Sequence, residues 1–424
     1  MLDINLVRER PEMVREDLQR RGLVKKIPLV DELLGWDKKR REAITGANEL
    51  KHRRNKIAVE ISRLKAEGKP IEEKVREMKA IPFQIKAADE EAQGSEARTK
   101  EILLRLPNLL HPSVPQGKDE SENVEVRRWG EPRLGDNLRD HIEIGMGLDL
   151  FDIERAARAA GARFYYLKRE LVLLNYALMK FALDFLQEKG FVIYQPPYML
   201  RREAEEAATD LADFEDVIYK VEGEDLYLIP TAEHALLALH MGEILEAKAL
   251  PLRYGGVSPC FRKEAGAHGR DTKGIFRVHQ FEKVEQFVFS RPEGSWQEHE
   301  GLLANAEEFY QKLQIPYRVM NICTGDIGTV AAKKYDIEAW LPGQGKYREI
   351  VSCSNCTDYQ ARRAGIRARE FPGAPTETVH TLNSTLVATE RTLVAILENY
   401  QQPDGSVRIP EVLVPYVGMG EIRR

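Results

Sequence analysis

The sequence predicts an α+β protein in which a long helical hairpin precedes a domain built on a largely antiparallel sheet. Between about residues 31 and 106, apolar and small residues recur with alternating spacings of four and three, and β-branched residues do not cluster. Beyond residue 132, short apolar runs alternate with helical stretches but form no repeating βαβ units. The length of 424 residues also favours two domains, because single domains usually run to about 100 to 200 residues.

Composition and charge narrow the class of protein. Hydrophobic residues make up 43% of the sequence and charged residues 31%, and the charged fraction exceeds the usual ~25% of globular chains. The formal net charge of -5 argues against a uniformly basic nucleic-acid binder but is compatible with a local basic surface. No apolar run reaches the roughly 18 to 20 residues of a membrane span, and the start, with an acid at Asp3 and no apolar stretch, carries no signal-peptide pattern. We therefore expect a cytoplasmic protein without a membrane segment.

The first domain is expected to cover residues 1–110. Residues 1–27 indicate a short amphipathic start, and the long pattern over 31–106 then predicts two helices of about 35 residues each. Gly68 and Pro70 mark the turn between these helices, because glycine ends helices and proline begins them. At 1.5 Å per residue the antiparallel pair would be roughly 50 Å long.

The first helix of this hairpin is unevenly charged. Between Asp37 and Ala66 it carries ten Lys or Arg residues against four acids. A solvated helix face is one interpretation, and a projecting arm that binds an RNA phosphate backbone is the other. Under the second interpretation the residues expected to contact RNA are Lys51, Arg53, Arg54 and Lys56.

Proline marks two irregular places in the chain. Pro82 falls on the apolar seam of the second helix, where we expect it to bend the helix or interrupt its hydrogen bonds. Residues 111–132 are rich in proline and acid and are predicted to form a linker. The second domain would then span 133–424.

Residues 260–287 carry the most chemical information. They predict a strand, a polar glycine-rich loop that includes Gly266 and Gly269, and a returning strand. Side chains two apart on a strand share a face, and those expected on one face are Arg262, Glu264, Phe281, Lys283 and Glu285. A guanidinium can hold a phosphate, a ring can stack on a base, and carboxylates can accept from an amine or hydroxyl. This set suits a nucleotide with an amino acid beside it, and a salt-bridged hairpin is the structural alternative.

The same stretch resembles motif 2 of the class II aminoacyl-tRNA synthetases in the form found in the seryl family. FRKEAG and GRDTKGIFRVHQFEKVEQF carry the resemblance, and four further stretches follow the family's order. GFVIYQPPYML resembles motif 1 with Pro197 as its interface proline, and PTAEHAL resembles the serine-binding segment. The stretch that begins CTGDIGTVAAKK resembles the strands supplying metal and nucleotide ligands, and HTLNSTLVATER resembles motif 3 in an archaeal or eukaryotic style.

The resemblance implies a reaction and its participants. A seryl-tRNA synthetase activates L-serine with ATP and Mg²⁺ to seryl-adenylate and then transfers the seryl group to the 3′ end of tRNA(Ser), and also of tRNA(Sec) where that tRNA is present. It also implies the class II antiparallel sheet flanked by helices, a coiled-coil arm that binds tRNA, and a homodimer formed through motif 1 at Pro197. No protein nucleophile is required, since a substrate carboxylate attacks the α-phosphorus and the protein supplies placement and positive charge.

Carried over position by position, the resemblance assigns the site residues. Arg262 and Arg391 would be catalytic, meeting the α- and γ-phosphates. The ATP-binding residues would be Arg262, Lys263, Glu264, Val278, Phe281, Glu349, Ile350, Val351, Ser352 and Arg391. The serine pocket would be lined by Thr231, Ala232, Glu233, Arg262, Glu285, Asn383 and Thr385. Glu349 and Ser352 would hold Mg²⁺, and Glu390 is expected to temper the charge of its neighbour Arg391.

Three other interpretations stay open at this point. Cys353 and Cys356 form a CxxC that could contribute to a zinc site, although a second such pair is missing. A relative that loads a carrier protein instead of tRNA would share the site but lack the arm over 31–106. A non-catalytic adaptor could keep the fold, but would not need intact Arg262 and Arg391.

Overall fold

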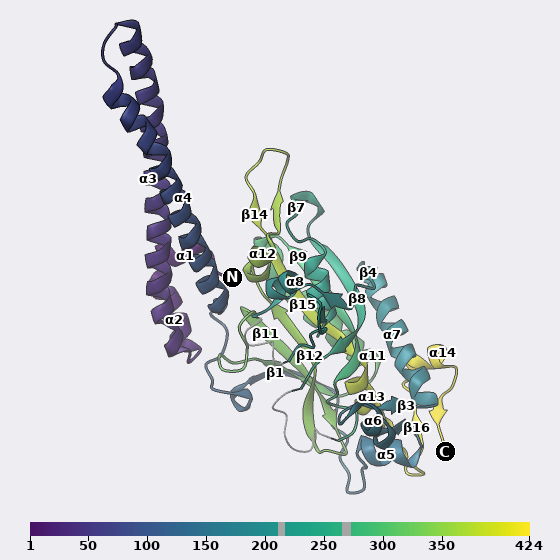
Figure 1. The fold of residues 1–424 in the computed structure, drawn as a ribbon. Coiled ribbons are helices and arrows are strands. Elements are labelled where there is room, and N and C mark those ends of the chain that lie inside the picture. Colours follow the sequence, from purple (N-terminus) through teal and green to yellow (C-terminus); the bar gives the residue numbers. More distant parts are fainter. Residues whose placement is uncertain (211–216, 265–272) are drawn as a thin grey trace. The chain divides into compact units, whose positions relative to one another are not determined.

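The computed structural model describes residues 1–210, 217–264 and 273–424, which form two compact units, Met1–Pro107 and Asn108–Arg424 (Figure 1). The boundary between the units lies close to the predicted end of the first domain. No helix in these described stretches is long and apolar enough to cross a membrane.

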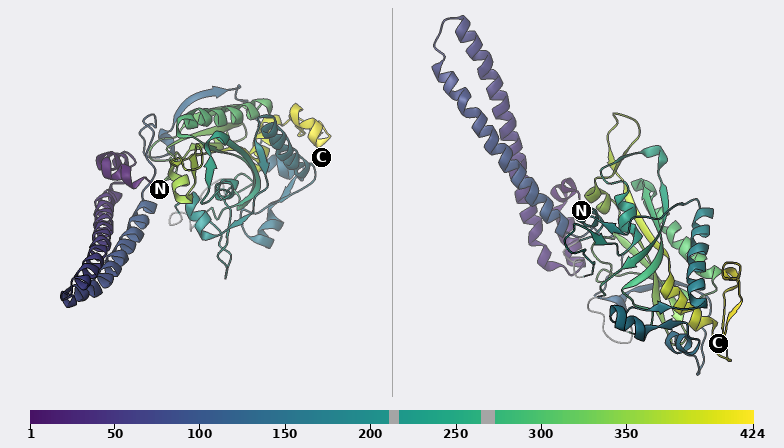
Figure 2. Two further views of the ribbon diagram at one scale, coloured as in Figure 1. Left: turned by 90° about the horizontal axis from the view of Figure 1, so that it is seen from above. Right: turned by 45° about the vertical axis from the view of Figure 1, so that its right-hand side comes forward.

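The first unit is helical and is dominated by two long antiparallel helices that lie side by side in every view (Figures 1 and 2). Its elements are α1 (Ile4–Glu9), α2 (Pro11–Arg20), a 3-10 turn (Val24–Lys26), α3 (Pro28–Ala66) and α4 (Glu72–Arg105). The predicted hairpin is thus confirmed. Its first helix begins at Pro28, where proline suits the first turn because its missing N–H has no partner there anyway.

A thin apolar seam joins α3 to α4. Ile57, Ile81 and Ile85 are buried in it, and further hydrophobic residues of both helices pack against these three. Pro82 is not on the seam, as the sequence suggested, but on the exposed side, and α4 continues through it without interruption. Solvent on that side can satisfy the carbonyl group that a proline leaves without its amide partner.

The second unit is built on an eight-stranded sheet with the order β1-β10-β11-β12-β15-β9-β8-β4, in which only the β4–β8 pair is parallel. Its strands are β1 (Val124–Trp129), β4 (Val192–Tyr194), β8 (Leu252–Phe261), β9 (Gln280–Ser290), β10 (Tyr317–Asn321), β11 (Lys333–Leu341), β12 (Lys346–Asn355) and β15 (His380–Ala388). The predicted α+β class with a largely antiparallel sheet is confirmed.

Helices and short strand pairs surround this sheet. The helices are α5 (His141–Gly147), α6 (Ile153–Ala160), α7 (Glu170–Glu188), α8 (Arg202–Ala208), α10 (Ala232–Ala238), α11 (Ser295–Lys312), α12 (Tyr359–Ala364), α13 (Thr389–Tyr400) and α14 (Val414–Val417). The short strands are β2 (Phe151–Asp152) with β3 (Tyr166–Leu167), β5 (Met199–Leu200) with β6 (Tyr227–Leu228), β16 (Val407–Arg408) with β17 (Glu421–Ile422), and β7 (Ile244–Glu246), β13 (Arg367–Arg369) and β14 (Glu377–Thr378). Single 3-10 turns lie at Glu120–Glu122, Ala247–Ala249, Pro292–Gly294 and Glu411–Leu413.

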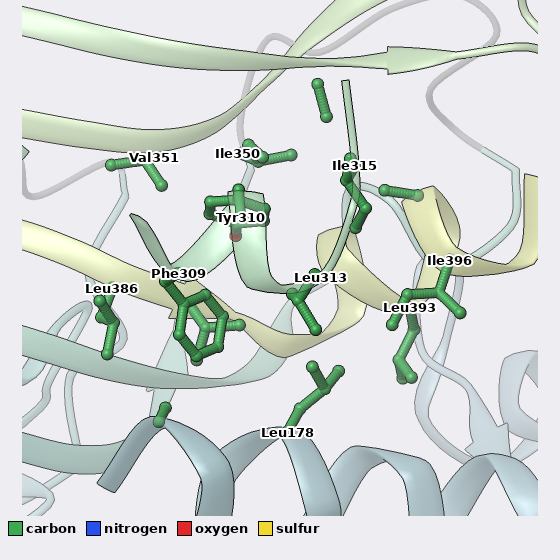
Figure 3. Packing of buried hydrophobic residues seen from close by; sticks show 14 of the residues in the cluster. Leu178, Phe309, Tyr310, Leu313, Ile315, Ile350, Val351, Leu386, Leu393 and Ile396 are labelled. Atoms are coloured by element: carbon green, nitrogen blue, oxygen red, sulfur yellow. The ribbon is translucent and has the colours of Figure 1, made fainter. Parts of the chain in front are cut away.

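The main hydrophobic core of this unit lies between one face of the sheet and the helices α7, α11 and α13. Figure 3 shows Leu178, Phe309 and Leu393, one from each of these helices, near Val351 and Leu386 of the strands. A second cluster, with Phe287 and Phe289 of β9, packs with α10 and α12. Because side chains alternate along β9, these two clusters occupy opposite faces of the sheet.

The segment predicted as a linker, 111–132, belongs to the second unit and is not a free connection. It contains β1, which pairs antiparallel with β10 and forms one edge of the large sheet. Around the start of this segment, the amides of Asn108 and His111 donate to the carbonyls of Thr329 and Ala332 at 2.8 and 2.9 Å. Its acids and prolines suggest a linker, but β1 is an edge strand, and an edge strand tolerates exposed polar side chains.

Candidate active site

A cavity of about 620 Å³ opens on the sheet face that carries the polar side chains of β9. Phe281, Lys283 and Glu285 line it, whereas Val284 between them is buried in the main core. The alternation expected along the return strand is therefore confirmed. This cavity lies wholly within the second unit.

Two β-bulges set which residues of the neighbouring strands reach the cavity. On β12 the pairing shifts between Glu349 and Val351, so Ile350 is the extra residue and Glu349 joins Ser352 in lining the cavity. On β15 the pairing shifts in the same way around Leu386. Residues three apart would otherwise point to opposite faces of a strand.

Arg262 lines the cavity and follows directly on the end of β8 at Phe261. Its Nε donates to the carbonyl of Pro230 at 3.2 Å, and its guanidinium lies 5.2 Å from the centre of the Phe281 ring. Glu264 also lines the cavity but has a φ of 49°, so it leaves the strand geometry expected for it. Arg277 approaches the Glu264 carboxylate at 3.5 Å.

Arg391 faces the same cavity from the start of α13. Its Nη1 donates to the carbonyl of Glu349 at 3.1 Å and lies 3.3 Å from the Oε1 of that residue, and its guanidinium lies over the ring of Phe276. Burial disfavours the ionised form of Glu349, but Arg391 and Lys334 outweigh it and lower the pKa of this carboxyl. The cavity thus holds a charged carboxylate between cationic groups.

Glu390 does not temper Arg391 as the sequence suggested. Its carboxyl turns to the hydroxyl of Tyr165 and to the backbone amide of Glu282, 3.0 Å from Oε2. Burial, together with the negative charge of Glu282, raises the pKa of Glu390 well above its usual range. The raised pKa disfavours a charge on Glu390, and the partner of Arg391 is Glu349 instead.

A second group of acids and hydroxyls lies across the β11–β12 pair. Asp336 pairs in register with Ser352, and the pair brings both side chains to one face of the sheet. The Oδ1 atom of Asp336 is buried with no hydrogen-bond partner, and Lys334 lies 3.4 Å from its other oxygen. Burial and the nearby Glu349 raise the pKa of Asp336. Carboxylate oxygens are ligands that Mg²⁺ prefers, and an Asp336 oxygen without a hydrogen-bond partner lies beside the Ser352 hydroxyl.

The other end of the cavity is a buried hydrogen-bonding network. The Nζ of Lys283 donates to Thr231 Oγ1 at 2.7 Å and pairs with Glu285 Oε2 at 2.5 Å. Thr385 Oγ1 donates to the same carboxylate at 3.4 Å. Burial raises the pKa of Glu285, and the Lys283 charge opposes that rise. The network is small and polar, and it suits a ligand with a hydroxyl and an ammonium group.

Glu233 and Asn383 complete this end of the cavity. Gln360, fully buried on α12, donates to Glu233 Oε1 at 2.7 Å and accepts from the hydroxyl of Thr381 at the same distance. Asn383 donates to the Sγ atom of Cys356 at 3.5 Å. Both predicted serine-pocket residues therefore face the cavity with fixed orientations.

The structure brings most of the predicted site residues together. Three do not line the cavity: Val351 and Ala232, which are buried in the protein interior, and Lys263. Those that line it are Thr231, Glu233, Arg262, Glu264, Val278, Phe281, Glu285, Glu349, Ile350, Ser352, Asn383, Thr385 and Arg391. The predicted loop glycines Gly266 and Gly269 lie outside the described residues.

Several lining residues had no predicted role. Strand alternation predicts the cavity face for Lys283 but no role for it, and no motif points to Lys334 or Arg277, which also line the cavity. A lysine two residues before Glu285 on a strand is a signal that the sequence does contain. Within the described parts of the chain, no group of three or more His, Cys, Asp or Glu could hold a metal, so the zinc interpretation of Cys353 and Cys356 gains no support.

Comparisons with known proteins agree with this geometry. Two family models match: the tRNA synthetase class II core domain (G, H, P, S and T) over residues 217–400 and the seryl-tRNA synthetase N-terminal domain over residues 1–110. The serine–tRNA ligase of Pyrococcus horikoshii is 55% identical, and the match covers 100% of this chain and 97% of that protein.

Solved structures show the same similarity. Seryl-tRNA synthetase from Pyrococcus horikoshii, complexed with ATP, has a TM-score of 0.97 at 54% identity over 100% of this chain and 99% of that one. The cytoplasmic serine–tRNA ligase of Naegleria fowleri, in complex with AMP, has a TM-score of 0.89 at 41% identity with the same coverage.

Proposed function

The chain belongs to the seryl-tRNA synthetase family and is a serine–tRNA ligase, and from this premise we propose how its cavity and its helical hairpin divide the reaction. The cavity binds ATP and L-serine and forms seryl-adenylate. The hairpin binds tRNA(Ser), whose 3′ end receives the seryl group. The observation that carries the proposal is that one cavity is lined both by the two arginines Arg262 and Arg391 and by the polar network around Glu285.

Arg262 and Arg391 are proposed to hold the ATP phosphates. Both guanidinium groups line the cavity, and the pairing of Arg391 with Glu349 leaves Arg262 with a neutral carbonyl and an aromatic face. Attack of the serine carboxylate on the α-phosphorus transfers negative charge to the pyrophosphate that leaves. Fixed positive groups stabilise this developing charge without reorganising during the step. Glu264 and Phe281 are the candidates for binding the adenine.

We propose that Glu349 and Ser352 hold Mg²⁺. The fit rests on the bulge that turns both residues to the cavity and on the orphaned Oδ1 of Asp336 beside Ser352. A bound Mg²⁺ would neutralise phosphate charge and would compete with Arg391 for Glu349.

The serine side of the cavity is proposed to consist of Thr231, Glu233, Glu285, Asn383 and Thr385. Alanine would leave the polar groups of this pocket unpaired at a free-energy cost, and threonine would be excluded by size. Glu233, which Gln360 orients, is the candidate acceptor for one of the polar groups of serine.

The arm is the proposed tRNA contact. Of its four predicted residues, Lys51 pairs with Asp89 at 3.3 Å and Arg53 with Glu77 at 2.7 Å across the hairpin. Arg54 and Lys56 are exposed and have no ion-pair partner among the described residues. Unpaired cations bind phosphates without first breaking a salt bridge, so Arg54 and Lys56 are the stronger candidates. The family model over residues 1–110 also disfavours the alternative of a carrier-protein substrate.

A homodimer formed through motif 1 at Pro197 is proposed, and exposed apolar residues on β4 and α7 support it. Strand β4 is an edge of the large sheet, and Val192 on it is 55% exposed. Leu173 and Tyr176 on α7 are also largely exposed. Large apolar groups gathered on one monomer surface are typical of an interface. We also propose a cytoplasmic location, as in the Naegleria relative, and activity on tRNA(Sec) where that tRNA is present.

The test is serine-dependent exchange of pyrophosphate into ATP, followed by charging of tRNA(Ser) by the same preparation. We expect both activities, and expect no transfer of serine to an acyl-carrier protein. Absence of exchange would refute the proposed chemistry, and exchange with transfer only to the carrier protein would refute the proposed acceptor.

A further inference from the structure

A buried lysine in the serine pocket has no role in the function described above. Lys283 lies on β9 directly between Phe281 and Glu285 on the cavity face, and its side chain is only 6% exposed. Lysine is almost never buried unless it is paired, because removing an ammonium group from water is costly. The groups that pair with the Lys283 ammonium therefore indicate the role of this lysine.

The first partner is the hydroxyl of Thr231. Thr231 Oγ1 accepts from the backbone N of Glu233 at 3.2 Å, as the N-cap of α10, and from Lys283 Nζ at 2.7 Å. A hydroxyl offers two acceptor lone pairs and one proton. With both lone pairs engaged, the Thr231 hydroxyl can act toward a ligand only as a donor.

The second partner is the carboxylate of Glu285, of which 2% is exposed. Its Oε2 accepts from Lys283 at 2.5 Å and from Thr385 at 3.4 Å, whereas its Oε1 has no hydrogen-bond partner in the described part of the chain. Oε1 is thus left as an acceptor for the ligand. Without a neighbouring cation, a carboxyl this deeply buried would favour its neutral form and could donate instead.

We infer that Lys283 is a positioning residue that fixes the polarity of the serine pocket, holding Glu285 as an acceptor and the Thr231 hydroxyl as a donor. The pocket then favours an amino acid whose side chain carries a hydroxyl over one of similar size that does not. This inference rests on the proposed function of the cavity.

Among the described residues, the charged and titratable groups that act on Glu285 come from several elements. Glu233 on α10 adds negative charge, Arg262 beyond β8 and Lys283 on β9 add positive charge, and the thiols of Cys260 and Cys353 are buried nearby. Burial, the largest influence, raises the pKa of Glu285, and Lys283 is the leading group that lowers it. Loss of Lys283 should therefore raise this pKa further.

The test compares Lys283→Met and Glu285→Gln with the wild-type protein in serine-dependent and alanine-dependent exchange of pyrophosphate into ATP. For Lys283→Met we expect kcat/KM for serine to fall roughly 100-fold, while the KM for ATP stays within about twofold. Exchange with alanine should fall much less, so the preference for serine over alanine should shrink at least about tenfold. A Lys189→Met control, which removes an exposed body lysine paired with Glu308, should change none of these values.

The pH dependence of kcat/KM shows whether Lys283 acts on the protonation of Glu285 or only on the packing of the pocket. In Lys283→Met the rise of kcat/KM for serine with pH should move to higher pH than in the wild-type protein, because Glu285 must lose its proton to accept and its pKa rises without the Lys283 charge. Glu285→Gln should lose the serine preference without this upward movement.

The double variant Lys283→Met/Glu285→Gln buries no uncompensated charge, and so carries the test if Lys283→Met does not fold. It should prefer serine over alanine no more than Glu285→Gln does. A Lys283→Met protein that keeps the wild-type preference for serine and the wild-type pH profile would overturn the inference, as would a double variant that keeps that preference. Absence of exchange in the wild-type protein would instead refute the proposed function.

Discussion

The helical arm and the catalytic body use charge in opposite ways. On the arm the charged side chains are exposed. The apolar cluster between its two helices contains only three buried residues in the described structure, Ile57, Ile81 and Ile85. In the body the charges that matter are buried and held by specific partners, as Lys283 is held by Glu285 and Thr231. Exposed charges act over distance and are screened by salt, whereas buried charges act locally and strongly. A protein that must bind a long polyanion and also polarise a small substrate has a use for both.

The largest expected effect separates the two regions at once. Arg262→Ala removes a fixed cation from the body cavity, and we expect pyrophosphate exchange to fall about 1000-fold or more. The affinity for tRNA(Ser), measured by filter binding, should stay the same, because the arm is untouched. A matching loss of tRNA affinity would break the proposed separation.

The next effect concerns the stability of the body. Burial lowers the pKa of His299 from 6.5 to about 4, and its Nε2 lies 3.1 Å from the carbonyl of Cys353. The unfolded chain takes up a proton below about pH 6.5 but the native state only near pH 4, so stability falls as the pH drops through this window. The loss should reach about 3 kcal/mol by pH 4.

Urea unfolding at a series of pH values checks this expectation. His299→Gln, which can keep a donor near Cys353, should show a shallower loss of stability on acidification than the wild type. Identical pH dependence in the two proteins would show that His299 is not the group responsible.

A smaller effect is expected from the arm. Arg54→Ala/Lys56→Ala should weaken tRNA(Ser) binding about tenfold and flatten its salt dependence, without changing exchange. The matched control Lys51→Ala/Arg53→Ala removes the same charge from residues already paired with Asp89 and Glu77, and should weaken binding less. Equal effects of the two pairs would mean that ion pairing does not decide which arm cations contact tRNA.

The smallest effect tests the value of an exposed ion pair. Arg53 is 65% exposed, and Glu77→Gln should change the stability of the arm by less than about 1 kcal/mol, as followed by circular dichroism. Because it frees Arg53, the same variant should tighten tRNA binding by about twofold. Weaker tRNA binding by Glu77→Gln would count against a phosphate contact by Arg53.

The sequence predicted the regular parts of this architecture. The hairpin followed from a sustained helical period, and the cavity face of β9 followed from strict alternation of Phe281, Lys283 and Glu285. Both patterns depend only on local geometry, and local geometry is what a sequence records directly.

What the sequence did not reveal depends on pairing between strands. The extra residue Ile350 forms a bulge that turns Glu349 to the cavity. This bulge can be recognised only from the pairing of β12 with β11. Glu390 was expected to act on its neighbour Arg391, but α13 begins there and the two side chains diverge to different partners. The prediction that residues 111–132 form a linker was wrong for a similar reason, since β1 depends on pairing with β10 more than on its own composition.

The division of labour between arm and body can be tested most directly by removing the arm. A protein in which a short glycine-rich turn replaces residues 31–106 should be assayed beside the full chain for exchange and for charging of tRNA(Ser). We expect exchange near the full-chain rate and charging reduced by about 100-fold or more. Charging at the full-chain rate would contradict the account, and so would loss of exchange from a truncated protein whose body remains folded.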